Sequence, residues 1–313
     1  MAPRSFAKNW LKGTDLQRKL LMPFSTEENL TDLAVERWSN IPDPRLRKIM
    51  TSLVKHLHGW VRDIEPTEEE WIAAVNFLTE TGKICTDKRQ EFILLSDTLG
   101  VSMLVDSINH RLSSKATPTT VTGPFHIHDS PEIADGQSMS GDAPGIPCFV
   151  EGKVMDFDGK PLGNVMLDVW QTDGEGLYEA QVEASNAYMR GIYHSKADGS
   201  YVVRTVAPIG YTIPLDGTVG GLFGKTNISP YRPAHIHFLL DSPGFHRIIT
   251  HLFQKGDQYI ETDVVYGVKE PLIVEFVKKK TGEKAPGGEV MTTPFYVVHY
   301  DFTLQKLSQA KAA

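Results

Sequence analysis

The segment Pro233-Ala-His-Ile-His-Phe-Leu-Leu240 decides the fold class. It is a short, mostly apolar run of the kind that forms a buried β-strand. Side chains on a strand alternate between its two faces, so His235 and His237 point to the same side. Two imidazoles held on rigid β structure can bind one metal ion. Two satisfied core histidines are the alternative interpretation.

Further β-type runs lie on both sides of this segment, separated by turn signals such as Asp198-Gly199. Many short strands without helical patterns between them favour a β-sandwich. The predicted strands are Val165–Trp170, Ile192–His194, Tyr201–Arg204, Ile236–Leu240, Ile248–Phe253, Leu272–Phe276 and Tyr296–Phe302.

The first 115 residues show helical periodicity instead. Capping boxes at Ser25–Glu28 and Thr67–Glu70 predict two helix starts, because the hydroxyl and the carboxylate can each bind a free backbone N–H group. A third helical pattern covers residues 92–108. The stretch Ala116–Pro147 is rich in Pro, Gly, Ser, Thr and Asp and predicts a long loop.

Length and composition limit the classes of function. The 313 residues fit one large domain or two ordinary ones, and a net charge of −7 argues against a nucleic-acid binder. No apolar run approaches the roughly 18 residues of a membrane span, and no signal core follows the N-terminus. Two cysteines without a CxxC pairing fit a reducing compartment. We expect a cytoplasmic α+β protein, with a helical domain at residues 1–120 and an antiparallel β-sandwich at residues 121–313.

Six of the eleven histidines form three His-x-His pairs. His56 and His58 lie in helical sequence, where positions i and i+2 point in different directions. His126 and His128 lie in loop sequence that fixes no direction. Scarce cysteine disfavours a thiolate zinc site. Asp168, Asp241 and Asp257 are candidates for a ferrous two-His, one-carboxylate site. Candidate phenolate ligands for a ferric ion are Tyr178, Tyr188, Tyr193, Tyr211 and Tyr231, and spacing does not choose among them.

Taken together, these residues resemble the intradiol ring-cleavage dioxygenases. The matching segments are Gly163–Gln171 with Tyr178, Gly210–Pro214, Tyr231–Phe238 and Gly256-Asp257. Tyr178 and Tyr211 are 33 residues apart and Tyr211 and His235 are 24 apart, which fits the two-Tyr, two-His iron site of this family. The segment Arg89–Gly100 is similar to the amino-terminal domain of its hydroxyquinol and catechol 1,2-dioxygenase branch.

The resemblance implies an enzyme with one ferric ion in each subunit. The implied ligands are Tyr178, Tyr211, His235 and His237. Tyr211 matches the tyrosine that the substrate displaces and that accepts a substrate proton. Arg232 matches a cation that stabilises negative charge developing on the ring. His251 stands where many catechol enzymes carry Gln, and both a contact with reaction intermediates and a packing role stay open.

The implied reaction of aromatic catabolism inserts both atoms of O2 between the hydroxyl-bearing carbons of a catechol-type ring. The matched pocket positions are Leu94, Asp97, Val121, Thr122, Gly123, Pro124, Ile213, Pro214 and Arg232. The Asp97 carboxylate can accept a hydrogen bond from a third hydroxyl, and a helix-stabilising role is the alternative. We therefore expect hydroxyquinol (benzene-1,2,4-triol) as substrate, giving 3-hydroxy-cis,cis-muconate or maleylacetate. Catechol, giving cis,cis-muconate, is the alternative.

The resemblance also implies a homodimer formed through the helical domain, which in this family can hold a phospholipid. Apolar positions around Leu53, Leu57, Trp60 and Trp71 have no evident cover within a minimal helical bundle, which agrees with a contact between subunits. A function of another class also stays open: a non-catalytic β-sandwich binding module whose His and Tyr residues belong to the core.

Overall fold

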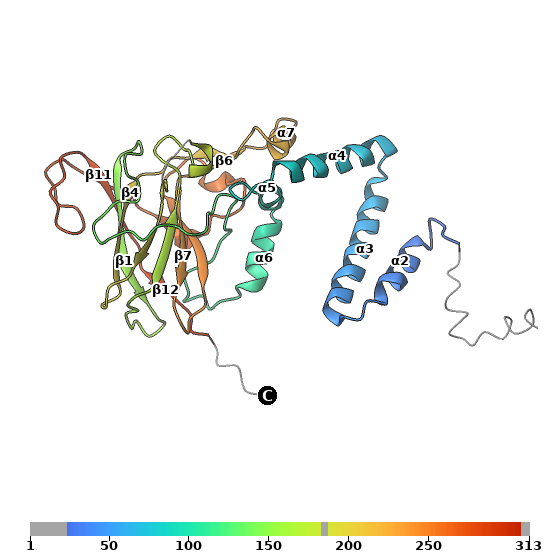
Figure 1. The fold of residues 1–313 in the computed structure, drawn as a ribbon, viewed down its shortest axis with the longest axis horizontal. Coiled ribbons are helices and arrows are strands. Elements are labelled where there is room, and N and C mark those ends of the chain that lie inside the picture. Colours follow the sequence, from blue (N-terminus) through green and yellow to red (C-terminus); the bar gives the residue numbers. More distant parts are fainter. Residues whose placement is uncertain (1–23, 183–186, 308–313) are drawn as a thin grey trace, which may run out of the picture. The chain divides into compact units, whose positions relative to one another are not determined.

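The computed structural model describes residues 24–182 and 187–307 of the chain (Figure 1). The helices are α2 (Leu30–Ser39), α3 (Pro44–Ile64), α4 (Glu68–Ile84), α5 (Glu91–Thr98), α6 (Val101–Asn109) and α7 (Thr218–Phe223), with 3-10 helices η1 (Glu179–Gln181), η2 (Ile260–Thr262) and η3 (Glu270–Leu272). The strands are β1 (Pro147–Met155), β2 (Met166–Trp170), β3 (Arg190–His194), β4 (Ser200–Val206), β5 (Tyr211–Thr212), β6 (Tyr231–Arg232), β7 (His235–Asp241), β8 (Ile248–Gln254), β9 (Ile273–Val274), β10 (Val277–Lys279), β11 (Phe295–His299) and β12 (Phe302–Thr303).

The chain forms two compact units, the first ending at Asn76 and the second beginning at Phe77. In the first unit α2 packs against α3. The α3 helix begins at Pro44, where the Asp43 carboxylate accepts from the backbone N–H of Leu46, and it ends at Glu65 in a left-handed conformation. Three apolar side chains of α3 are about half exposed: Leu53 (46%), Leu57 (50%) and Trp60 (53%).

The observed helix starts agree in part with those predicted from the capping boxes in the sequence. Thr67 and Glu70 form the expected capping box, with Glu70 N–H donating to Thr67 Oγ1 (3.2 Å) and Thr67 N–H donating to Glu70 Oε2 (2.9 Å). The box expected at Ser25–Glu28 is wrong by one residue, because the reciprocal bonds join Thr26 and Asn29. The pattern over residues 92–108 is two helices, α5 and α6, separated at Gly100, whose φ is +72°.

The second unit contains a sandwich of two five-stranded sheets (Figure 1). One sheet has the order β10-β11-β1-β12 with β4 also paired to β1, and the other has the order β3-β2-β7-β8-β9. Completely buried side chains from both sheets form the core between them, including Val150, Val203, Leu167 and Phe238. A helical region followed by a β-sandwich is therefore confirmed.

The expectation of a purely antiparallel sandwich is wrong, since both sheets are mixed. Strand β1 pairs in parallel with β11 and β12, and β8 pairs in parallel with β9. Sequence patterns also missed β1 itself, the centre of its sheet. Its apolar run is interrupted at Gly152, where a Cβ would collide with the backbone carbonyl of Tyr300. Glycine is needed there for close approach of two chain segments, although it weakens the strand pattern.

The segment between α6 and β1 is irregular, as its composition predicts. Its backbone is fixed to the sandwich by Thr117 N–H, which donates to Thr303 O (3.0 Å), and by Thr120 N–H, which donates to Ile249 O (2.8 Å). These bonds hold residues 121–125 beside the β7 sheet. Within residues 24–182 and 187–307, every helix is too short or too polar to cross a membrane.

Candidate metal centre and substrate pocket

Strand β7 presents two histidines to the face of its sheet that lies outside the sandwich core. Ile236 and Phe238 point into the core, whereas His235 and His237 point the other way, as the period of two requires. Both imidazoles are buried, and their Nε2 atoms are 3.2 Å apart. Trp170 of β2 lies opposite His237 in register, and its indole stacks on the His237 ring at 4.7 Å. The strands therefore fix both rings.

Two tyrosine oxygens complete the cluster. Tyr178 Oη lies 3.0 Å from His237 Nε2 and 3.0 Å from Tyr211 Oη. Tyr178 precedes η1 and stacks on Phe125, whereas Tyr211 lies in β5, where it pairs with Arg232 of β6. Two imidazole nitrogens and two phenol oxygens thus meet at one point, although they come from three separate segments of the chain.

The protonation of this cluster suits a metal ion. His235 Nδ1 donates to the Pro233 carbonyl (2.6 Å), so its Nε2 carries the lone pair of the ring. Burial lowers the pKa of both imidazoles and raises the pKa of both phenols, which keeps all four groups neutral. A bound cation that displaces the phenol protons would gain two hard, anionic ligands, and this donor set fits a trivalent ion.

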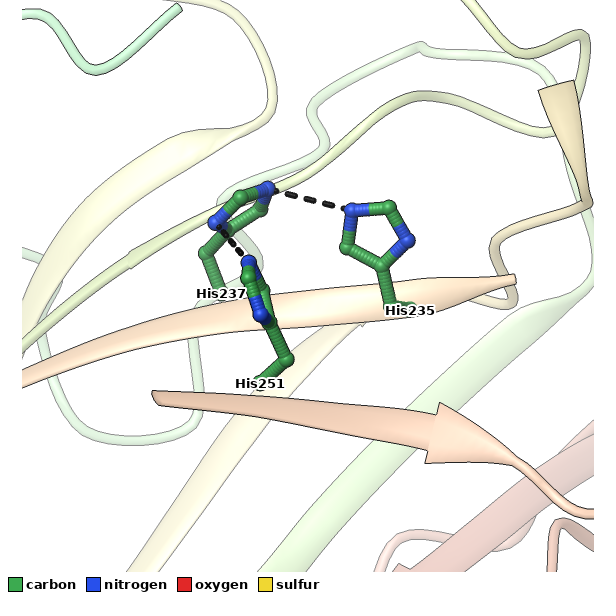
Figure 2. A group of neighbouring side chains, drawn as sticks. All are labelled: His235, His237 and His251. Atoms are coloured by element: carbon green, nitrogen blue, oxygen red, sulfur yellow. Dashed lines mark hydrogen bonds between the residues drawn. The ribbon is translucent and has the colours of Figure 1, made fainter. Parts of the chain in front are cut away.

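His251 of β8 belongs to the same group of buried imidazoles, whose ligand atoms lie within 4.8 Å of one another. Figure 2 shows that it contacts His237 through the nitrogen that faces away from His235. His251 Nε2 is 2.7 Å from His237 Nδ1. We therefore place His251 behind the cluster and not among its ligands. No carboxylate joins this histidine group in the described part of the chain, which disfavours a two-His, one-carboxylate site.

Arg232 places a fixed positive charge beside the cluster. Its Nη1 lies 2.9 Å from His235 Nε2, and its Nε donates to Asp263 Oδ1 at 3.0 Å. Both side chains of this ion pair are at most 4% exposed. Burial opposes the charge, but Asp263 and the phenol oxygens together raise the pKa of Arg232. The guanidinium therefore stays charged.

A small cavity opens beside Tyr211 and Arg232. Six of the nine expected pocket residues line it: Leu94, Asp97, Pro124, Ile213, Pro214 and Arg232. Val121 is buried in the apolar cluster around Leu94, and Gly123 lies against the His237 ring, where an added Cβ would be 3.4 Å from Cε1. Thr122 is partly exposed in the same loop.

Phe125 and Val265 also line this cavity, and the sequence reasoning missed both. Phe125 directly follows the expected Pro124, so its position in the chain was an available signal. Val265 lies beyond every matched segment and carries no motif. It joins the pocket because its loop packs in the same buried cluster as Leu94 and Ile213.

Asp97 of α5 is an unpaired buried carboxylate in this cavity. It is 1% exposed, and neither of its oxygens has a hydrogen-bond partner among the described residues. Ser102, on the next helix, donates its hydroxyl to Ser96. Burial raises the pKa of Asp97 to about 6, against the lowering effects of the nearby Ser102 hydroxyl and of the Arg232 charge. An unsatisfied buried acceptor is costly, so a pocket ligand that donates to it gains binding energy.

The raised pKa of Asp97 makes a prediction about stability. The folded state holds the Asp97 proton more tightly than the unfolded state does. Ionising Asp97 therefore destabilises the fold: this loss of stability is absent near pH 4, grows as the pH rises and is complete above the folded-state pKa of about 6. We expect Asp97→Asn to raise the free energy of unfolding at pH 7.5 by up to about 3 kcal/mol. Near pH 4 the gain should vanish. Urea unfolding at the two pH values checks this, and an equal effect at both would contradict it.

The remaining candidate residues lie outside the cluster. Tyr188 donates to Asp173 (2.7 Å), Tyr193 donates to the Arg204 carbonyl (3.1 Å), and Tyr231 stacks on Tyr259. Asp168 pairs with His126 (2.9 Å), Asp257 accepts from Ala234 N–H (3.0 Å), and Asp241 is exposed at the end of β7. His58 contacts Thr31 (3.1 Å) and His56 contacts the Ser52 carbonyl (2.8 Å), both in the helical unit.

Comparison with known proteins matches both halves of the chain. The family model described as Dioxygenase matches residues 121–306, and the one described as Catechol dioxygenase N terminus matches residues 43–117. A hydroxyquinol 1,2-dioxygenase from Rhizobium sp. (strain MTP-10005) is 42% identical over 285 residues, covering 90% of this chain and 97% of the relative. A 6-chlorohydroxyquinol 1,2-dioxygenase from Cupriavidus pinatubonensis is 42% identical over 257 residues, covering 82% of this chain and 93% of the relative.

Solved structures give the same grouping. The crystal structure of hydroxyquinol 1,2-dioxygenase from Pseudomonas putida DLL-E4 aligns with a TM-score of 0.81 and 43% sequence identity. The alignment covers 90% of this chain and 99% of that structure.

Proposed function

This chain belongs to the intradiol ring-cleavage dioxygenase family, and from that premise we propose that it acts on hydroxyquinol, as a hydroxyquinol 1,2-dioxygenase. The observation that carries the choice of substrate is the buried, unpaired carboxylate of Asp97 in the cavity beside Tyr211 and Arg232. Relatives named for hydroxyquinol and 6-chlorohydroxyquinol support the same choice. Catechol is the alternative substrate.

We propose a ferric ion as the cofactor, one in each subunit, held by Tyr178, Tyr211, His235 and His237. The two imidazole Nε2 atoms and the two phenol oxygens form a donor set that suits it. When bound, this ion supplies an anchor for both hydroxyl oxygens of the diol and withdraws charge from the ring, so that O2 can attack a ring carbon.

The two tyrosines have different positions relative to the cavity, and this suggests different roles. Tyr211 lines the cavity, whereas Tyr178 is 4% exposed and packs under Phe125. We assign Tyr211 Oη, which a bound ferric ion would hold as a phenolate, as the group that takes a proton from a diol hydroxyl, since it faces the substrate. Tyr178 then stays in place behind it.

Arg232 and Asp97 act on the ring from within the cavity. The guanidinium of Arg232, held by Asp263, stabilises negative charge that develops on the ring during attack by O2. The carboxylate of Asp97 accepts a hydrogen bond from the third hydroxyl of hydroxyquinol, which catechol lacks. Catechol therefore leaves a buried acceptor unpaired, and that cost separates the two substrates.

Asp97→Asn tests this assignment through substrate preference. An amide is a weaker acceptor than a carboxylate, so kcat/KM for hydroxyquinol should fall by roughly 10- to 100-fold, while kcat/KM for catechol should stay within about threefold. The measurement is oxygen uptake by iron-loaded protein with each diol. Asp106→Asn is the matched control, because Asp106 is a buried helical carboxylate that pairs with His110 and Thr119 away from the cavity. Equal losses for both diols would refute Asp97 as the reader of the third hydroxyl.

We also propose that residues 1–120 serve as a dimerisation domain. The exposed apolar side chains Leu53, Leu57, Trp60 and Trp71, at 46–61% exposure, support a homodimer, and the bound phospholipid is proposed on the family resemblance alone. The free thiols of Cys85 and Cys148 support a reducing, cytoplasmic location.

A further inference from the structure

We propose that His251 and Thr120 form a positioning pair that fixes the tautomer and the ring orientation of His237. The inference rests on the proposed function, because it concerns a side chain assigned there as an iron ligand. It differs from both roles that the sequence left open for His251, a contact with reaction intermediates and simple packing.

The contacts of His251 lead away from the cavity and not into it. His251 is completely buried on β8, and it is absent from the residues that line the cavity in the described structure. Its Nε2 lies 2.7 Å from His237 Nδ1, and its Nδ1 lies 2.6 Å from Thr120 Oγ1. Both nitrogens are therefore engaged by protein groups, and neither is free to contact a substrate.

Only one arrangement of protons makes all these contacts while leaving His237 Nε2 free for a metal ion. His237 must then carry its proton on Nδ1 and donate it to His251 Nε2. His251 must in turn carry its own proton on Nδ1 and donate it to Thr120 Oγ1. The three groups form a chain of hydrogen bonds in which each group donates to the next, from His237 to the hydroxyl of Thr120.

The other proposed histidine ligand, His235, shows why this chain of hydrogen bonds matters. His235 is fixed in the same tautomer by the main-chain carbonyl of Pro233, a contact that no side-chain substitution removes. Among the described residues no main-chain group contacts His237 Nδ1, which depends on His251 instead. Thr120 is held in turn by its backbone N–H, which donates to Ile249 on β8. The orientation of His237 therefore depends on two side chains, those of His251 and Thr120.

The test compares His251→Phe with His251→Gln. Phenylalanine keeps the aromatic volume but accepts no hydrogen bond, whereas the glutamine amide can accept from His237. We expect His251→Phe to weaken ferric-ion binding by roughly 10- to 100-fold and to shift the visible tyrosinate-to-iron absorption. His251→Gln should restore both to within a few fold of the wild type. Iron affinity and the absorption spectrum are measured without substrate.

Thr120→Val is an independent test, because it removes only the hydroxyl that accepts the last hydrogen bond, the one from His251 Nδ1. A smaller loss of iron affinity is expected, together with a shift of the same absorption band. Thr250→Val is the matched control, since the buried Thr250 hydroxyl donates to the Pro118 carbonyl and not to a histidine. Should His251→Phe fail to fold, Thr120→Val against Thr250→Val decides the question.

Wild-type iron affinity and an unchanged spectrum in folded His251→Phe, or in Thr120→Val, would overturn the proposal, whatever their thermal stability. The wild type is measured first, so failure of the proposed function is seen separately. If the wild type itself binds no ferric ion and develops no colour, the iron assignment falls and this inference falls with it. If the wild type binds iron but does not turn over hydroxyquinol, only the substrate assignment falls.

Discussion

Replacing Tyr178 by phenylalanine is expected to lower kcat by more than roughly 100-fold and to remove much of the visible tyrosinate-to-iron absorption. Loss of a group that merely supports a ligand costs about 10- to 100-fold in metal affinity or activity, so loss of a ligand should cost more. Tyr178 Oη contacts both His237 Nε2 and Tyr211 Oη, so the change leaves a gap at the centre of the cluster. Absorption spectra and oxygen uptake of iron-loaded protein give the two readings.

Tyr188→Phe is the control for this experiment. Tyr188 also donates a hydrogen bond within the same unit, but to Asp173 and away from the cluster. The Tyr188→Phe variant should lose about 1 kcal/mol of its free energy of unfolding and keep the visible absorption of the iron-loaded protein. Unchanged colour and activity in both Tyr178→Phe and Tyr211→Phe would show that the phenols are not ligands, and would favour the binding module or another metal chemistry.

Replacing Arg232 by methionine is expected to damage both stability and catalysis. The substitution strands the Asp263 carboxylate, which is 2% exposed, and breaking a buried ion pair in this way costs about 3–5 kcal/mol. It also removes the cation that faces the ring, for which we expect a loss of roughly 100- to 1,000-fold in kcat. Urea unfolding and steady-state kinetics measure the two effects.

A second substitution separates these two effects of Arg232. The double variant Arg232→Met, Asp263→Leu removes the unpaired buried charge, so part of the stability should return, although the backbone N–H groups of Val265 and Gly267 lose their acceptor. The loss in kcat should remain, because the positive charge is still missing. Recovery of activity along with stability would show that Arg232 acts only through the fold.

The sequence predicts the parts of this molecule that depend on local pattern. The period of two on β7 gives the shared face of His235 and His237, and the helix-capping residues at Thr67–Glu70 give the start of α4. These features are local because the backbone geometry of a strand or a helix turn fixes them. Family resemblance then supplied Tyr178 and Tyr211, which spacing alone did not separate from three other tyrosines.

Features that depend on contacts between distant segments were not predictable in this way. The parallel pairing of β1 with β11 joins residues nearly 150 positions apart, and the gap in the β1 pattern at Gly152 reflects contact with Tyr300. The partner of Arg232, Asp263, and the pocket residue Val265 lie on a loop that carries no motif. Likewise, Thr120 is visible as a partner of His251 only when the irregular segment is placed against β8.

The measurement that tests the central claim most directly is oxygen uptake by the iron-loaded wild-type protein with hydroxyquinol and catechol side by side, corrected for hydroxyquinol autoxidation. We predict a higher kcat/KM for hydroxyquinol by at least roughly tenfold, which corresponds to one satisfied acceptor at Asp97. An equal or higher kcat/KM for catechol would contradict the proposed substrate, and uptake with neither diol would contradict the proposed enzyme activity.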